Sequence, residues 1–89
     1  TAMIWAAEKG DKGIVELLLK NGANPNNTDD DGITPLMEAA AGGHTAVVSL
    51  LLQNGADPKL KDESGKTAID HALKRKQQSI ADIIAASAH

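Results

Sequence analysis

Apolar residues in this chain form short stripes with helical spacing. The clearest stripe consists of Val47, Val48, Leu51 and Leu52. Spacings of one, four and five residues place these side chains on one face of a helix. Asn54-Gly55 follows directly, and glycine readily adopts the left-handed conformation that closes a helix. We therefore predict a helix that begins at Thr45 and ends before Asn54.

A shorter helix is predicted just before it. Thr34-Pro35 marks its start, because a threonine hydroxyl can accept a hydrogen bond from a free backbone N–H and proline suits the first helical position. Gly42-Gly43 stops this helix after about two turns. The segment 56–66, ADPKLKDESGK, is rich in turn-forming residues and predicts an extended β-turn arm. The unit is thus two short helices and an arm.

This unit repeats along the chain with a period of 33 residues and no gap. Residues 1–33 and 34–66 are identical at 14 of the 33 aligned positions. Residues 67–89 form a degenerate third copy, with Thr67 aligned to Thr34 and with apolar residues in register at Ile69, Ile80, Ile83 and Ile84. Thr67 and Asp70 resemble a capping box. The sequence therefore predicts one domain over 1–89 that is built from three copies.

Composition narrows the function classes. The apolar share is 42% and Trp5 is the only aromatic residue, so the core must consist of Leu, Ile, Val and Ala. The lack of cysteine excludes a disulfide framework, a thiolate metal site and a cysteine nucleophile, and it favours an intracellular setting, cytoplasmic or nuclear. A net charge of -3 argues against nucleic-acid binding. No apolar run approaches the roughly 18 residues that would cross a membrane.

One stretch offers a different chemistry. Residues 27–38, NTDDDGITPLME, match the calcium loop of an EF-hand at its first, third, fifth, sixth and twelfth places. However, the segment around Pro25 breaks any helix leading into this loop, and the frame shifted by one repeat has Leu60 at its first place. The repeat instead explains Asp29 and Gly32 as hairpin residues. We expect no metal and no cofactor.

The repeat resembles a known family. Residues 32–58, GITPLMEAAAGGHTAVVSLLLQNGADP, are similar to the ankyrin repeat, and the likeness extends over essentially the whole chain. The resemblance implies an all-α repeat solenoid in which helix-turn-helix repeats with β-turn arms stack into an elongated surface. The family histidine that usually makes hydrogen bonds between neighbouring repeats is replaced by Ile4, Met37 and Asp70, and the first copy opens without a preceding arm.

The resemblance also implies a function, namely a non-catalytic module that binds a protein or peptide on the concave side formed by the arms and the first helices. A groove with tryptophan, acidic residues and one histidine favours a partner segment with basic and apolar residues. The candidate contact residues are the outward positions of the arms and first helices: Trp5, Glu8, Asp30, Asp31, Ile33, Glu38, Glu63, Ser64, Lys66 and His71.

Several of these residues have a structural alternative. Trp5 is either an interface anchor or a shield for the open end of the first repeat, where self-association is also possible. The acidic tip around Asp30 favours a solvated turn over a strong binding contact. His71 and the adjacent Asp70 are residue types that serve as a general base and the carboxylate that orients it, but no serine or threonine nucleophile accompanies them. We therefore predict that the chain is not an enzyme.

Other residues with possible functional chemistry are explained by structural roles. His44 precedes the second helix and is expected to bond the loop backbone. The basic residues at 74–76 end a helix, where the dipole favours positive charge. The third copy, with Ala85 and Ala86 in place of leucines, resembles a terminal cap. The resemblance further implies that Asn26 is a candidate for hydroxylation. A structural spacer or end cap in a longer array, or the ankyrin part of a larger enzyme, remain the alternatives.

Overall fold

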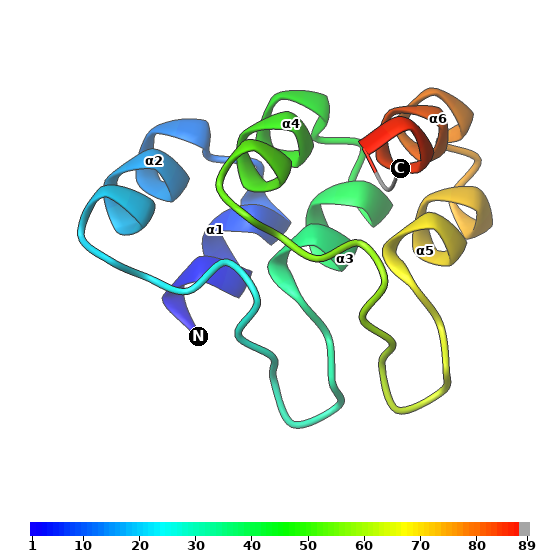
Figure 1. Ribbon diagram of the computed structural model, residues 1–89, viewed down its shortest axis with the longest axis horizontal. Coiled ribbons are helices and arrows are strands. Elements are labelled where there is room, and N and C mark those ends of the chain that lie inside the picture. Colours follow the sequence, from blue (N-terminus) through cyan, green and yellow to red (C-terminus); the bar gives the residue numbers. More distant parts are fainter. Residues whose placement is uncertain (88–89) are drawn as a thin grey trace.

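Six helices form three hairpins that stack side by side (Figure 1). The structure is a computed structural model that describes residues 1–87, with extents of 30 × 25 × 24 Å, so three hairpins give a stack that is barely elongated. The helices are α1 (Ala2–Lys9), α2 (Lys12–Lys20), α3 (Pro35–Ala41), α4 (Thr45–Gln53), α5 (Ala68–Lys74) and α6 (Gln78–Ser87). Within residues 1–87 no helix has the length and apolar character needed to cross a membrane.

The hairpins form two rows. The first helices α1, α3 and α5 make an inner row, and α2, α4 and α6 make an outer row (Figure 1). Two arms, residues 21–33 and 54–66, run from the end of one hairpin to the start of the next and extend past the same side of the inner row. The predicted all-α repeat architecture is thereby confirmed, with no strand assigned in the described part of the chain.

Threonine caps set the starts of the inner helices, as the sequence predicts. The hydroxyl of Thr34 accepts a hydrogen bond from the N–H of Met37 at 3.2 Å, and Thr67 accepts one from Asp70 at 3.4 Å. Each cap satisfies an N–H that would otherwise lack a partner at the helix start. The predicted capping box is also confirmed, because a carboxylate oxygen of Asp70 accepts the N–H of Thr67 at 3.0 Å.

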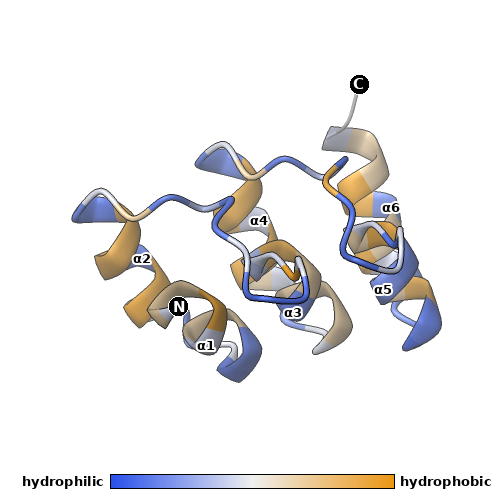
Figure 2. Cartoon of the chain, turned by 90° about the horizontal axis from the view of Figure 1, so that it is seen from below, coloured by the Kyte–Doolittle hydropathy of each residue, from blue (hydrophilic) through white to orange (hydrophobic). Residues whose placement is uncertain are grey.

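Small residues allow the inner helices to pack closely. Ala6, Ala39 and Ala72 lie at the same place in successive repeats, and all three are fully buried. Between the two rows the core is filled by larger aliphatic side chains, including Leu36, Val48, Leu51, Ile80 and Ile84. Burial of each such side chain contributes about 1.5–3 kcal/mol. Figure 2 shows that hydrophobic residues lie mainly on the helices, whereas the arms are largely hydrophilic.

Asn26 joins neighbouring repeats through both ends of its side-chain amide. Its Nδ2 donates to the carbonyl oxygen of Gly55 at 3.0 Å, and its Oδ1 accepts the N–H of Asp57 at 2.7 Å. The two arms are therefore tied together without the family histidine. Asp70 makes its hydrogen bonds to Thr67 of its own repeat instead.

A glycine and a histidine make a second link between repeats. The ring nitrogen Nε2 of His44 lies 3.0 Å from the carbonyl oxygen of Glu8, so His44 bonds the backbone as expected, but that of the preceding repeat. Its ring lies so close to Gly10 that a Cβ there would overlap it. Gly10 also has φ +74°, a left-handed conformation that favours glycine. Two requirements therefore select glycine at this position.

The same position differs in the third repeat. Gly43, one repeat further along, has φ +75°, and a Cβ there would lie 2.8 Å from the side chain of Gln77. In the third repeat the residue is Lys76, which keeps the left-handed backbone with φ +61°. Lys76 is exposed, so it retains the backbone requirement without a close neighbour.

Candidate partner-binding face

We define the inner face as the outward positions of α1, α3 and α5 together with the two arms. Along these helices the buried alanines recur, whereas the neighbouring outward positions change from repeat to repeat. One outward position holds Trp5, Glu38 and His71, and the next holds Glu8, Ala41 and Lys74. The inner face is thus a regular frame that presents a different side chain from each repeat.

The first arm holds its acidic tip in a tight hairpin. The Oδ1 atom of Asp29 accepts the N–H groups of Asp31 at 2.9 Å and Ile33 at 3.0 Å. Asp29 is therefore a hairpin residue, as the repeat predicts. Asp30 and Asp31 are exposed at the tip, whereas Ile33 is half-buried and packs against the core. Of these candidate contact residues, the two aspartates are the more accessible.

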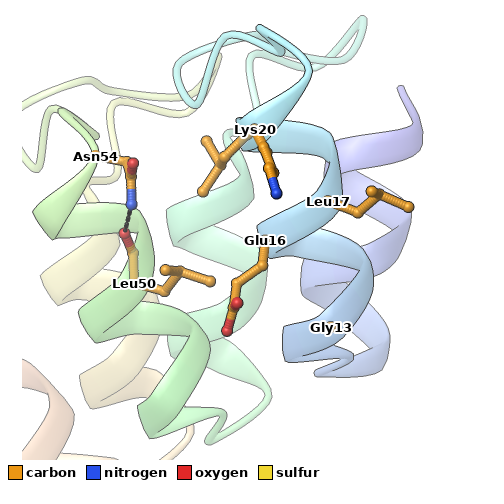
Figure 3. A pocket seen from close by; sticks show the side chains of 7 residues that line it. Gly13, Glu16, Leu17, Lys20, Leu50 and Asn54 are labelled. Atoms are coloured by element: carbon orange, nitrogen blue, oxygen red, sulfur yellow. Dashed lines mark hydrogen bonds between the residues drawn. The ribbon is translucent and has the colours of Figure 1, made fainter.

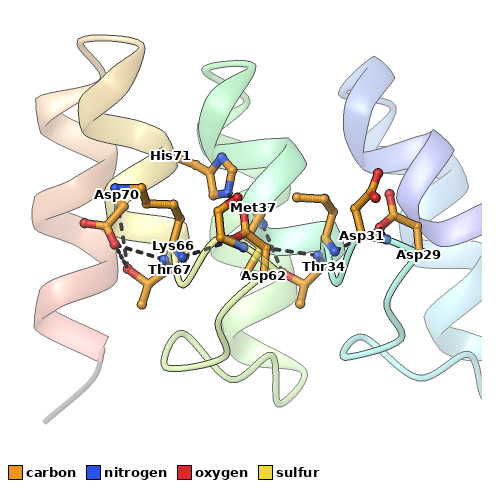
Figure 4. A network of polar contacts seen from close by, with 11 residues as sticks. Asp29, Asp31, Thr34, Met37, Asp62, Lys66, Thr67, Asp70 and His71 are labelled. Atoms are coloured by element: carbon orange, nitrogen blue, oxygen red, sulfur yellow. Dashed lines mark hydrogen bonds and ion pairs between the residues drawn. The ribbon is translucent and has the colours of Figure 1, made fainter.

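The second arm repeats this hairpin and adds a link to α5. The Oδ1 atom of Asp62 accepts the N–H groups of Ser64 at 2.8 Å and Lys66 at 3.0 Å, and its Oδ2 lies 2.8 Å from Nε2 of His71 (Figure 4). The Lys66 N–H lowers the pKa of Asp62 most, and the His71 bond lowers it further. The tips of the two arms also meet, since the N–H of Glu63 donates to the carbonyl oxygen of Asp31 at 2.9 Å.

His71 makes its carboxylate contact across the repeat boundary and not with its neighbour in the chain. His71 pairs with Asp62 rather than with the adjacent Asp70. The reason is that the carboxylate of Asp70 caps α5 through the N–H and hydroxyl of Thr67, and the Thr67 N–H lowers the pKa of Asp70. The histidine thus closes the arm onto the helix.

Glu38 is the counterpart of His71 in the preceding repeat, and its surroundings disfavour its charged form. Burial raises its pKa most, and the nearby charges of Glu8 and Asp29 raise it further, while His71 and Arg75 oppose the change. Among the described residues Glu38 forms no ion pair within 4.0 Å. A small cleft of about 230 Å³ brings together Glu8, Glu38, Ala41, Gly42 and Arg75.

A larger cleft of about 670 Å³ opens at the third repeat. It is lined by Asp62, Ser64, Lys66, Asp70, His71, Leu73 and Lys74. The structure thus brings three of the candidate residues together here, and it adds Leu73, whose exposed fraction is 45%. The sequence analysis did not single out Leu73. The 33-residue alignment could have identified Leu73, because a leucine stands there where the first two repeats have Ala7 and Ala40.

Trp5 lines neither of these clefts. Its exposed fraction is 53%, and Leu17 on α2 of the same hairpin is 59% exposed. A further cleft of about 460 Å³ lies between the outer helices α2 and α4, with Leu50 pointing into it (Figure 3). Leu17, the repeat counterpart of Leu50, points away from α4 (Figure 3). The first hairpin therefore exposes two large apolar side chains.

A family model described as ankyrin repeats in three copies matches residues 2–89. Comparison with curated proteins finds no match to this chain.

Proposed function

Because this chain belongs to the ankyrin repeat family, whose repeats generally mediate protein–protein interactions, we propose that its inner face binds a protein or peptide partner without catalysis. One observation carries this proposal. One buried position of the inner helices is alanine in all three repeats (Ala6, Ala39 and Ala72), whereas the outward position held by Trp5, Glu38 and His71 differs in every repeat. This arrangement suits a surface whose frame is constant and whose contacts are specific.

The proposed contact residues are those predicted from the sequence. Trp5 is the strongest single candidate, because exposed tryptophans that become buried on binding dominate interface energetics. The arm tips add Asp30 and Asp31, and hydrogen bonds within each arm hold them in place. A surface that is already ordered loses less conformational entropy when a partner binds.

The histidine pair has a structural role. Asp62 holds His71, but in residues 1–87 no serine or threonine hydroxyl is hydrogen-bonded to this histidine. A nucleophile activated by a base requires such a contact. The pair is instead accounted for by its position, since it fastens the second arm to α5.

A pull-down with a matched control tests the proposal. The test variant combines Trp5→Ala, Asp31→Asn and Glu38→Gln. The control variant combines Leu17→Ala, Glu16→Gln and Asp82→Asn, which remove the same kinds of group from exposed positions on the outer helices. We expect the test variant to lose partners that the native chain and the control both retain. Retention of every partner by the test variant would instead support a structural spacer.

The proposal includes a capping role for the third repeat, because two of its residues conflict with further stacking. Leu73 stands where the second repeat has the fully buried Ala40 on α3, and Lys76 stands where Gly43 lies close to Gln77. We expect Ala40→Leu to destabilise the fold by about 1–3 kcal/mol through overpacking and Leu73→Ala to change stability by less than about 0.5 kcal/mol. Urea titration measures both. A neutral Ala40→Leu would show that the position does not require a small residue.

A further inference from the structure

The charge of the chain changes in steps along the stack. Residues 1–33 contain six acidic and three basic side chains, residues 34–66 contain four and three, and residues 67–89 contain two and three. The net charge therefore runs from -3 through -1 to +1. This order follows the spatial order of the hairpins (Figure 1), so the stack has an acidic end and a weakly basic end.

On the inner face the acidic side chains at the first two repeats outnumber the basic side chain that faces them. Glu8 and Glu38 line one cleft together with a single cationic side chain, Arg75, and neither glutamate forms an ion pair within residues 1–87. Burial raises the pKa of Glu38 most, the charges of Glu8 and Asp29 raise it further, and His71 and Arg75 offset this only in part. A second cationic side chain placed in this cleft would relieve the remaining repulsion between the carboxylates, and the half-buried position of Glu38 would limit screening by water.

The third repeat offers the opposite preference. Lys66 and Lys74 both line the larger cleft, and neither is ion-paired in the described part of the chain. Asp62 and Asp70 in the same cleft keep their negative charge, but their oxygens already accept hydrogen bonds from the chain, Asp62 from backbone N–H groups and His71, and Asp70 from Thr67. The lysine ammonium groups are therefore the groups in this cleft that are left to bind a partner. The two lysines and the exposed Leu73 therefore suit an acidic segment that also carries an apolar side chain.

We propose that the partner segment is extended and charge-polarised, with basic residues over the first two repeats and acidic residues over the third. This inference rests on the proposed function, because it specifies the partner of the same face. Neighbouring packed helices lie about 8–10 Å apart, so Glu8 and Lys74, which are two repeats apart, are separated by about 16–20 Å along the stack. An extended chain covers this distance in about five or six residues.

Defined peptides test the charge pattern. The probe is a fluorescently labelled peptide with a pair of lysines, a spacer of about six neutral residues including leucine, and a pair of glutamates. Its reversed sequence covers the other chain direction. A peptide of the same composition with alternating charges and a peptide with lysines at both ends serve as comparisons. In fluorescence anisotropy at low salt, we expect one polarised peptide to bind about tenfold more tightly than either comparison.

Paired variants locate the effect. Glu8→Gln with Lys74→Gln should abolish this tenfold preference, whereas Glu16→Gln with Lys20→Gln, the same charge changes on α2, should preserve it. Equal binding of the peptide with lysines at both ends would overturn the polarised partner while leaving the inner face as a binding site. Absence of binding by all the peptides would also overturn the charge-polarised partner. The proposed function would still be tested separately by the pull-down with the Trp5, Asp31 and Glu38 variant.

Discussion

Lys76→Gly is expected to stabilise the fold, although it removes a side chain from the end of α5. Lys76 holds a left-handed backbone with φ +61°, whereas the aligned residues Gly10 and Gly43 are glycines at +74° and +75°. The left-handed backbone is required because the N–H of Lys76 donates to the carbonyl oxygen of Leu73 and the N–H of Gln77 donates to Ala72, which closes the helix.

The magnitude follows from two opposing terms. A residue with a Cβ pays about 1–2 kcal/mol for the left-handed conformation. Glycine avoids this strain but loses about 0.5–1 kcal/mol more conformational entropy on folding. The expected net gain is about 0.5–1 kcal/mol. For a domain of this size the melting temperature should rise by about 2–8 °C.

Urea denaturation followed by circular dichroism measures this gain. Lys76→Ala is the essential control, because it removes the charge near the helix end but keeps the Cβ. The difference between the glycine and alanine variants therefore isolates the backbone term. Lys74→Gly, inside α5, should lower stability by about 1 kcal/mol. If Lys76→Gly is no more stable than Lys76→Ala, the strain at this position is not real.

Three further outcomes are expected. Gly10→Ala should destabilise the fold by clearly more than Gly55→Ala in urea titrations, because both have φ above +70° but only Gly10 faces the His44 ring; equal losses would contradict the role of the ring. Glu38→Gln should raise stability at neutral pH, because the raised pKa of Glu38 means that its ionised form disfavours folding. That gain should disappear below the ordinary glutamate pKa of about 4.3, and a gain that grows at acid pH would be inconsistent with it. Trp5→Ser should reduce any concentration-dependent self-association in sedimentation velocity. A native chain that is monomeric and melts above roughly 80 °C would argue against self-association through the exposed first repeat.

Helix boundaries were predictable because local residues set them. Thr34-Pro35 and Thr67 begin α3 and α5, and Asn54 ends α4, as the sequence indicates. These signals act within a few residues of the backbone groups that they satisfy. The 33-residue period then extends the same prediction to each copy. Local capping and repetition therefore sufficed for the architecture.

Contacts between repeats were less predictable. The sequence places His71 beside Asp70, but α5 uses Asp70 as its own cap and the arm brings Asp62 to the histidine. Likewise, the closeness of His44 to Gly10 depends on how two hairpins stack. Such contacts join residues that are far apart in the chain, so no local sequence pattern predicts them. The inner-face contact residues stay predictions until a partner is bound.

The central claim, that partners bind the inner face, is tested most directly by two-dimensional NMR of the labelled chain titrated with a captured partner. We expect the amide signals of α1, α3, α5 and the two arms to shift, together with the indole signal of Trp5. Signals of α2, α4 and α6 should stay in place. Shifts confined to these outer helices, including the cleft at Leu50, would contradict it.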